Sequence, residues 1–148
     1  MPSKKRNFVY KTIHHVYNRG ILKQVIFKDR QDYKSFLKRI RKYRQKYPVE
    51  IKAYCLMPNH FHFLLQEIGF ENPFIPRFMQ QLQNSYAKYY SQKYSHSGRV
   101  MQGTYKSKQI KNEKHYYEVF EYIHDNPIKA QLVNKKGQWE FKSPLRWK

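Results

Sequence analysis

The sequence predicts an α+β domain in which helices pack on an antiparallel β-sheet. Short β-branched and aromatic runs alternate along the chain with longer stretches of helical periodicity. Two of these runs, residues 49–57 and 60–66, are separated only by the turn-forming pair Pro58-Asn59, which predicts an antiparallel hairpin. With 148 residues, of which 40% are hydrophobic and 18% aromatic, the chain can bury one core, so we expect a single domain over residues 1–148.

The first half of the chain adds a strand and a helix to this hairpin. Residues 7–17 (NFVYKTIHHVY) are β-branched and aromatic with partial alternation, and residues 18–20 (NRG) end them, so we expect a strand followed by a loop. From Asp29 the pattern becomes that of an amphipathic helix, which stops near Pro48. Its apolar side is formed by Tyr33, Phe36, Leu37, Ile40 and Tyr47.

The second half continues with a helix, a strand and another helix. Pro73 and Pro76 open the first of these helices, and residues 99–110 (RVMQGTYKSKQI) are typical of a fourth strand that carries a glycine. The last helix begins near Glu113 and is expected to end at residues 126–127 (Asn-Pro), because proline disfavours helix in the residue before it.

The order of the predicted elements reduces the number of folds that the chain can adopt. Strand, helix, strand, strand, helix and strand, in this order, match a ferredoxin-like split β-α-β arrangement. A third helix follows these six elements, and the tail to Lys148 is basic and irregular.

The charge of the chain indicates a polyanionic partner. There are 30 Lys and Arg against 10 Asp and Glu, a net charge of +20. Nucleic acid is the leading candidate, because Tyr and Phe interleaved with basic residues suit stacking on unpaired bases. An anionic membrane surface and a solvated basic surface are the alternatives. A small RNA-binding protein of the ribosomal type would have a similar composition.

Cysteine usage and hydropathy bear on the location. The single Cys55 excludes an internal disulfide and a cysteine-based metal framework, which favours a reducing cytoplasm. The N-terminal sequence has no apolar stretch of signal-peptide length, and no segment approaches the ~18 apolar residues of a membrane helix. We therefore expect a cytoplasmic protein with no membrane partner.

Two histidines lie one residue apart in the apolar run MPNHFHFLL (57–65). On a strand, residues i and i+2 face the same side, so His60 and His62 point together. Two adjacent imidazoles can share a divalent metal if a third ligand comes from elsewhere in the chain. The alternative is a pair of partly exposed histidines that contact only their neighbours.

The last helix offers a phenol and an amide on one side. Tyr122 and Asn126 are four residues apart, at the edge of an apolar stripe, and can face a cleft together. Ordinary packing is the alternative for Tyr122, since the chain has 14 tyrosines. The stripe consists of Tyr116, Val119, Phe120 and Ile123.

Four blocks of the sequence resemble a known family. Residues 53–65 (AYCLMPNHFHFLL) resemble the histidine–hydrophobic–histidine motif of HUH single-strand endonucleases. Residues 14–20 (HHVYNRG), 77–107 and 121–133 (EYIHDNPIKAQLV) extend the resemblance over nearly the whole chain. More narrowly, the chain resembles REP-associated tyrosine transposases, relatives of the single-tyrosine transposases of bacterial insertion sequences.

The resemblance implies a role for each candidate residue. His60 and His62 match metal-binding histidines, Tyr122 matches the nucleophile, and Asn126 matches the amide that completes the metal site. Many insertion-sequence relatives have Gln at this last position. The implied enzyme is a metal-dependent single-stranded DNA endonuclease and transesterase of the transposase type, with Mg²⁺ or Mn²⁺ and no small-molecule cofactor. It forms a 5′-phosphotyrosine intermediate on DNA that carries a hairpin.

The sequence gives weaker indications of the residues that contact DNA and of the oligomeric state. Lys106 and Lys108 alternate on one strand face, Arg19 lies in the first loop, and Arg77 begins the second helix. Each can contact a phosphate or remain a solvated charge. Related proteins act either as dimers that exchange the tyrosine helix or as monomers, so a monomer or a homodimer is expected.

Two questions stay open at this point. The group that takes the proton of the nucleophile is not evident, although His115 and His124 lie near Tyr122 in the sequence. The alternative to a cutting enzyme is a domesticated DNA- or RNA-binding module of the same fold that no longer cleaves.

Overall fold

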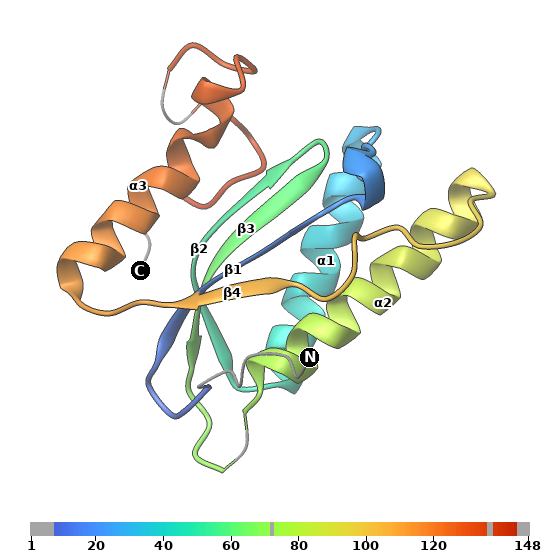
Figure 1. The fold of residues 1–148 in the computed structure, drawn as a ribbon. Coiled ribbons are helices and arrows are strands. Elements are labelled where there is room, and N and C mark those ends of the chain that lie inside the picture. Colours follow the sequence, from blue (N-terminus) through green and yellow to red (C-terminus); the bar gives the residue numbers. More distant parts are fainter. Residues whose placement is uncertain (1–7, 72, 136–137, 145–148) are drawn as a thin grey trace.

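The computed structural model describes residues 8–71, 73–135 and 138–144, which form one sheet with helices on both faces (Figure 1). The strands are antiparallel and lie in the order β2-β3-β1-β4. This confirms the predicted α+β class and its split β-α-β topology. The elements are β1 (Ile13–Arg19), η1 (Ile21–Lys23), α1 (Arg30–Lys46), β2 (Val49–Met57), β3 (His60–Glu67), α2 (Ile75–Tyr94), β4 (Lys106–Gln109) and α3 (Glu113–Lys129).

The sequence also led to expectations about membrane-spanning helices and about the number of domains. Among the described residues, every helix is too short or too polar to cross a lipid bilayer. That residues 1–148 form a single domain stays a prediction.

Alternation along β3 divides its side chains between two environments. Phe61 and Phe63 belong to the larger core cluster, which is filled from α1 and α2. His62 points to the other face, which α3 covers (Figure 1). The register pairs His62 with Tyr17 of β1, and Tyr17 with Lys106 of β4, so these three residues lie on the same face of the sheet.

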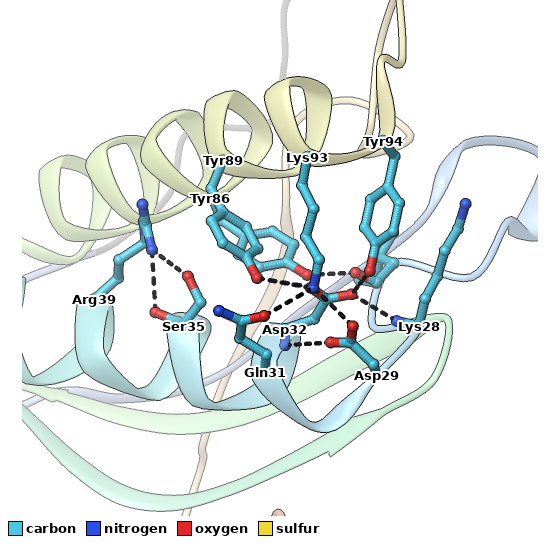
Figure 2. Close-up of polar contacts among 11 residues, drawn as sticks. Lys28, Asp29, Gln31, Asp32, Ser35, Arg39, Tyr86, Tyr89, Lys93 and Tyr94 are labelled. Atoms are coloured by element: carbon cyan, nitrogen blue, oxygen red, sulfur yellow. Dashed lines mark hydrogen bonds and ion pairs between the residues drawn. The ribbon is translucent and has the colours of Figure 1, made fainter.

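A buried carboxylate joins α1 to α2 on the face away from α3. Asp32 is fully buried and accepts hydrogen bonds from Tyr89 Oη (2.8 Å), Lys93 Nζ (2.9 Å), the Lys28 amide (2.9 Å) and the Tyr94 hydroxyl, as Figure 2 shows. Burial raises the pKa of Asp32, but the hydrogen bonds, led by that from Lys93, outweigh it and lower the pKa to about 2. The network holds α1 against the C-terminal part of α2 on this face of the sheet.

The C-terminal tail is more ordered than its composition predicted. Trp139 Nε1 donates to the Leu56 carbonyl at 2.8 Å, and the Leu56 amide donates to the Phe141 carbonyl at 2.8 Å. Ser143 Oγ lies 2.9 Å from Nε2 of His124 on α3, within hydrogen-bond distance. Residues 138–144 therefore run along β2, where Phe141 stacks on Tyr33 of α1 with ring centroids 4.0 Å apart and Ser143 contacts α3. These aromatic side chains find core contacts that only the folded sheet provides.

The first strand differs from its predicted bounds. β1 starts at Ile13, after a turn in which the Thr12 amide donates to the Val9 carbonyl at 3.0 Å and Lys11 has φ 73°. It ends at Arg19 rather than at residue 17, because Arg19 still pairs with His60 of β3. Residue 7 lies outside the described residues.

The fourth strand is shorter than predicted. β4 covers only Lys106–Gln109, whereas a strand over residues 99–110 was expected. Met101 makes an isolated bridge to Gly20, and Gly103 then takes φ 142°, which bends the chain before it rejoins the sheet. The alternation of side chains alone did not reveal this interruption.

The last helix passes through its proline. α3 runs to Lys129, with Pro127 inside it, whereas an end at residues 126–127 was expected. A proline there removes one backbone hydrogen bond, but the helix stops two residues later, so little regular structure is lost. The Asn126 carbonyl still accepts from the Ala130 amide at 2.9 Å.

Candidate active site

The two histidines of β3 face a common cavity beside α3. The ring centroids of His60 and His62 lie 5.1 Å apart, which confirms that both rings project from the same face of the sheet. Both line a cavity of about 740 Å³. His62 is only 6% exposed, and His60 is half-buried.

Helix α3 brings the predicted phenol and amide to these rings. The Tyr122 ring meets the His62 ring edge-on, with centroids 5.5 Å apart, and 43% of Tyr122 remains exposed. Asn126 Nδ2 donates to the Tyr122 carbonyl at 3.1 Å. A hydrogen bond with Asn126 raises the pKa of His60, which places the Asn126 amide beside this ring. The four candidate residues thus come together from two elements.

Burial keeps the histidines of the site neutral. It lowers the pKa of His62 to about 3, with smaller contributions from His15 and His60. It also lowers the pKa of His15 to about 4, assisted by Lys108 and His115. Burial lowers the pKa of His60 as well, and the hydrogen bond with Asn126 partly opposes this. Neutral imidazoles have a lone pair available for a metal.

Further residues surround the histidines that sequence reasoning did not single out. His15 Nε2 lies 3.0 Å from His62 Nδ1, and Asn59 Oδ1 lies 2.7 Å from His60 Nδ1. Tyr17 stacks on His62 with centroids 5.5 Å apart and 27° between the planes. The alternation of β1 places His15 and Tyr17 on one face, but only the register of the sheet shows that this face meets His62.

The basic residues predicted to bind DNA fall into two groups. Arg19 and Lys106 line the cavity, and Lys108 lies opposite His15 on the same face of the sheet. Arg77 is exposed on α2, on the other face of the sheet, and the structure does not bring it to the cavity. The remaining lining residues are polar or aromatic: Tyr17, Asn18, Lys23, Asn59, Gln102 and Thr104.

The two histidines near Tyr122 in the sequence have other contacts. His124 is buried, with Nδ1 2.9 Å from the Phe120 carbonyl and Nε2 against Ser143. His115 Nδ1 accepts a hydrogen bond from the Lys111 amide at 3.0 Å. Neither residue lines the cavity, so their geometry supports structural roles.

The donor set fits a divalent cation. It consists of two neutral imidazoles, His60 and His62, and the amide oxygen of Asn126. Imidazole nitrogen suits transition metals, and amide oxygen suits Mg²⁺ and Mn²⁺. Within the part of the chain that the structure describes, no group of three or more His, Cys, Asp or Glu residues is arranged to hold a metal.

Comparison with known proteins gives one family and two similar folds. The profile of the family described as "Transposase IS200 like" matches residues 8–126. No curated protein sequence matches the chain. The structure of a REP-associated tyrosine transposase bound to a REP hairpin is similar, with a TM-score of 0.77 and 19% identity, over 100% of this chain and 92% of that chain. The crystal structure of a Deinococcus radiodurans R1 protein described as a transposase has a TM-score of 0.56 and 20% identity, over 84% of this chain and 97% of that chain. At these identities the two structures show a shared fold.

Proposed function

Because the chain belongs to the family of IS200-like transposases, we propose that it is a metal-dependent endonuclease and transesterase of single-stranded DNA. The observation that carries this proposal is the convergence of the Tyr122 phenol with His60 and His62 in one cavity, together with the hydrogen bond between His60 and Asn126. A similar fold has been solved with a REP hairpin bound, which supports DNA that carries a hairpin as the substrate.

Each residue of the cluster has a role in this proposal. His60, His62 and Asn126 would hold Mg²⁺ or Mn²⁺. When bound there, the metal would supply polarisation of the scissile phosphate and would stabilise the charge that develops on its oxygens. Burial of the two rings keeps them in the neutral form that binds metals.

Tyr122 is the nucleophile of the proposed reaction. Its phenol oxygen loses a proton and attacks the phosphorus, and the bond from phosphorus to the 3′ oxygen breaks. The leaving oxygen takes up a proton and becomes a free 3′-OH, while the 5′ phosphate stays esterified to Tyr122. One phosphodiester is exchanged for another, so the reverse reaction can rejoin DNA without ATP.

In this proposal, basic residues around the cavity bind the DNA backbone. Arg19 and Lys106 line it, and Lys108 extends the same face. Side chains of this kind give most of the affinity for a polyanion through phosphate contacts. A phosphate contact by Arg77 stays a prediction, as does the choice between monomer and homodimer.

The test is the covalent adduct. The protein is incubated with a single-stranded hairpin DNA and Mn²⁺, separated under denaturing conditions, and the adduct is mapped by mass spectrometry. We expect the nucleotide on Tyr122. Tyr122→Phe keeps the ring and should fold and bind DNA without forming an adduct. Tyr117→Phe is the matched control, because Tyr117 is 57% exposed on the same helix and should leave the adduct unchanged.

Two outcomes would contradict the proposal. An adduct on Tyr117, or cleavage by Tyr122→Phe at the wild-type rate, would assign the nucleophile elsewhere. Tight hairpin binding by the wild-type protein without any adduct would instead identify a binding module that does not cleave.

A further inference from the structure

The proton of the His60 ring is placed by the residue before it. Asn59 Oδ1 lies 2.7 Å from His60 Nδ1. An amide oxygen can only accept a hydrogen bond, so Nδ1 of His60 is the donor. A neutral imidazole has one proton, so Nε2 of the same ring is left with a lone pair.

The orientation of the Asn59 amide is itself fixed by the neighbouring loop. Asn59 Nδ2 donates to the Lys23 carbonyl at 3.3 Å, which turns Oδ1 toward His60. Leu22 and Lys23 have φ of 53° and 62°, a left-handed conformation that costs roughly 1 kcal/mol or more for each such residue. The Ile21 amide donates to the Val100 carbonyl at 3.0 Å and holds the loop in place. This strained loop therefore presents the carbonyl that selects one orientation of Asn59.

The His62 ring has a partner on the adjacent strand. His62 Nδ1 lies 3.0 Å from His15 Nε2, in a buried contact, so one of the two nitrogens must donate to the other. If His15 donates, the single proton of His62 lies on Nε2 and no lone pair is left for a metal. If His62 donates, its Nε2 is free and His15 accepts. Only the second arrangement allows His62 to bind a metal, because Nδ1 is already engaged.

We propose that Asn59 and His15 are positioning residues of the metal site. Each accepts a hydrogen bond from Nδ1 of one histidine, His60 or His62, and so reserves Nε2 of that ring for the metal. The inference rests on the proposed function, in which these two histidines are ligands. Partners that fix the tautomer of a ligand histidine typically contribute 10- to 100-fold to metal affinity, so a loss of about tenfold or more is expected when one is removed.

The first test measures Mn²⁺ affinity by calorimetry in the absence of DNA. His15→Phe keeps a ring but removes the acceptor, and we expect it to weaken binding about tenfold or more. His15→Gln places an amide oxygen close to the position of Nε2 and should restore affinity to within about threefold of the wild-type value.

The same comparison applies to the partner of His60. Asn59→Leu has a similar size and no acceptor, and it should weaken Mn²⁺ binding, whereas Asn59→Asp keeps an oxygen that accepts and should not. His14→Phe is the control for the loss of a buried histidine. Its ring lies on the other face of the sheet, where Nε2 contacts Thr12 Oγ1 at 2.8 Å, so Mn²⁺ affinity should not change.

The second test observes the protons directly. In ¹⁵N-detected spectra of the protein saturated with diamagnetic Mg²⁺, we expect His60 and His62 to be protonated at Nδ1, and His15 to be unprotonated at Nε2. A proton on Nε2 of His62 under these conditions would overturn the inference.

The outcomes separate this inference from the proposed function. Equal losses of Mn²⁺ affinity in His15→Phe and His15→Gln, or wild-type affinity in His15→Phe and Asn59→Leu, would remove the positioning roles and leave the metal-dependent function standing. A wild-type protein that does not bind Mn²⁺ would remove the metal dependence itself, and the inference with it.

Discussion

His60 and His62 share a cavity but have different surroundings. His62 is 6% exposed and packs between His15 and Tyr17, so its replacement would disturb the sheet as well as the site. His60 is half-buried beside Asn59, at the start of β3. Substitution at His60 therefore gives the cleaner test of a ligand role.

His60→Ala should abolish cleavage and leave hairpin binding largely intact. Affinity comes mainly from phosphate contacts, whereas cleavage requires the complete metal site. Adduct formation and fluorescence anisotropy with a labelled hairpin measure the two effects separately. His96→Ala is a suitable control, since His96 lies in the exposed loop after α2, where its Nε2 contacts the Arg99 carbonyl. An equal loss of binding and cleavage in His60→Ala would identify His60 as a structural residue.

The contact between α1 and α2 includes a hydrogen-bond network centred on the buried Asp32 carboxylate. We expect Asp32→Ala to lower the free energy of unfolding by about 3 to 5 kcal/mol, because the Tyr89, Lys93 and Tyr94 side chains lose a buried acceptor. Urea unfolding measures this change. Glu140→Ala is the control, since it breaks an exposed ion pair with Arg30 and should cost at most about 1 kcal/mol. Similar losses in both variants would mean that the buried network adds no particular stability.

The same carboxylate makes stability depend on pH. The pKa of Asp32 is about 2 in the folded protein, against an ordinary value of 3.8, so ionisation of Asp32 favours the folded state. This contribution, roughly 2 kcal/mol, is fully present above about pH 4 and is lost as the pH falls toward 2. Urea unfolding of the wild-type protein and of Asp32→Asn at pH 6 and pH 2.5 should show their difference in stability narrowing at the lower pH. A constant difference would show that the Asp32 pKa is not lowered by folding.

Only part of the positive charge of the chain lies at the cavity. The net charge is +20, and Arg19, Lys23 and Lys106 line the cavity on the face that α3 partly covers. A DNA strand bound at Tyr122 would therefore meet a small subset of the basic residues, and substitutions elsewhere should matter less.

Lys106→Ala should weaken hairpin binding and reduce its dependence on salt. One lost phosphate contact lowers the slope of log affinity against log salt concentration by about 0.7 to 0.9. Lys42→Ala removes an exposed lysine from α1, away from the cavity, and should leave the slope unchanged. Anisotropy titrations at several salt concentrations make the comparison. Equal changes in both variants would show that the affinity comes from the overall charge rather than from this face.

Local patterns in the sequence predicted the order of the main helices and strands, and they predicted that the two members of each of two pairs of site residues lie on the same side of their element. The hairpin of β2 and β3 and the start of α1 after Asp29 follow from alternation and from capping, which depend on near neighbours. The spacing of His60 and His62 on a strand places both rings on one face whatever the rest of the chain does. In the same way, Tyr122 and Asn126 share one side of a helix.

Only the tertiary structure decided how these pairs meet and what surrounds them. The contact of His62 with His15 depends on the register between β3 and β1, and the approach of Tyr122 depends on which face of the sheet α3 covers. The break before β4 and the pairing of residues 138–144 with β2 likewise arise from contacts between distant segments. Periodicity in a sequence reports the faces of one element, whereas the pairing of faces is fixed by the packing of the whole chain around its core.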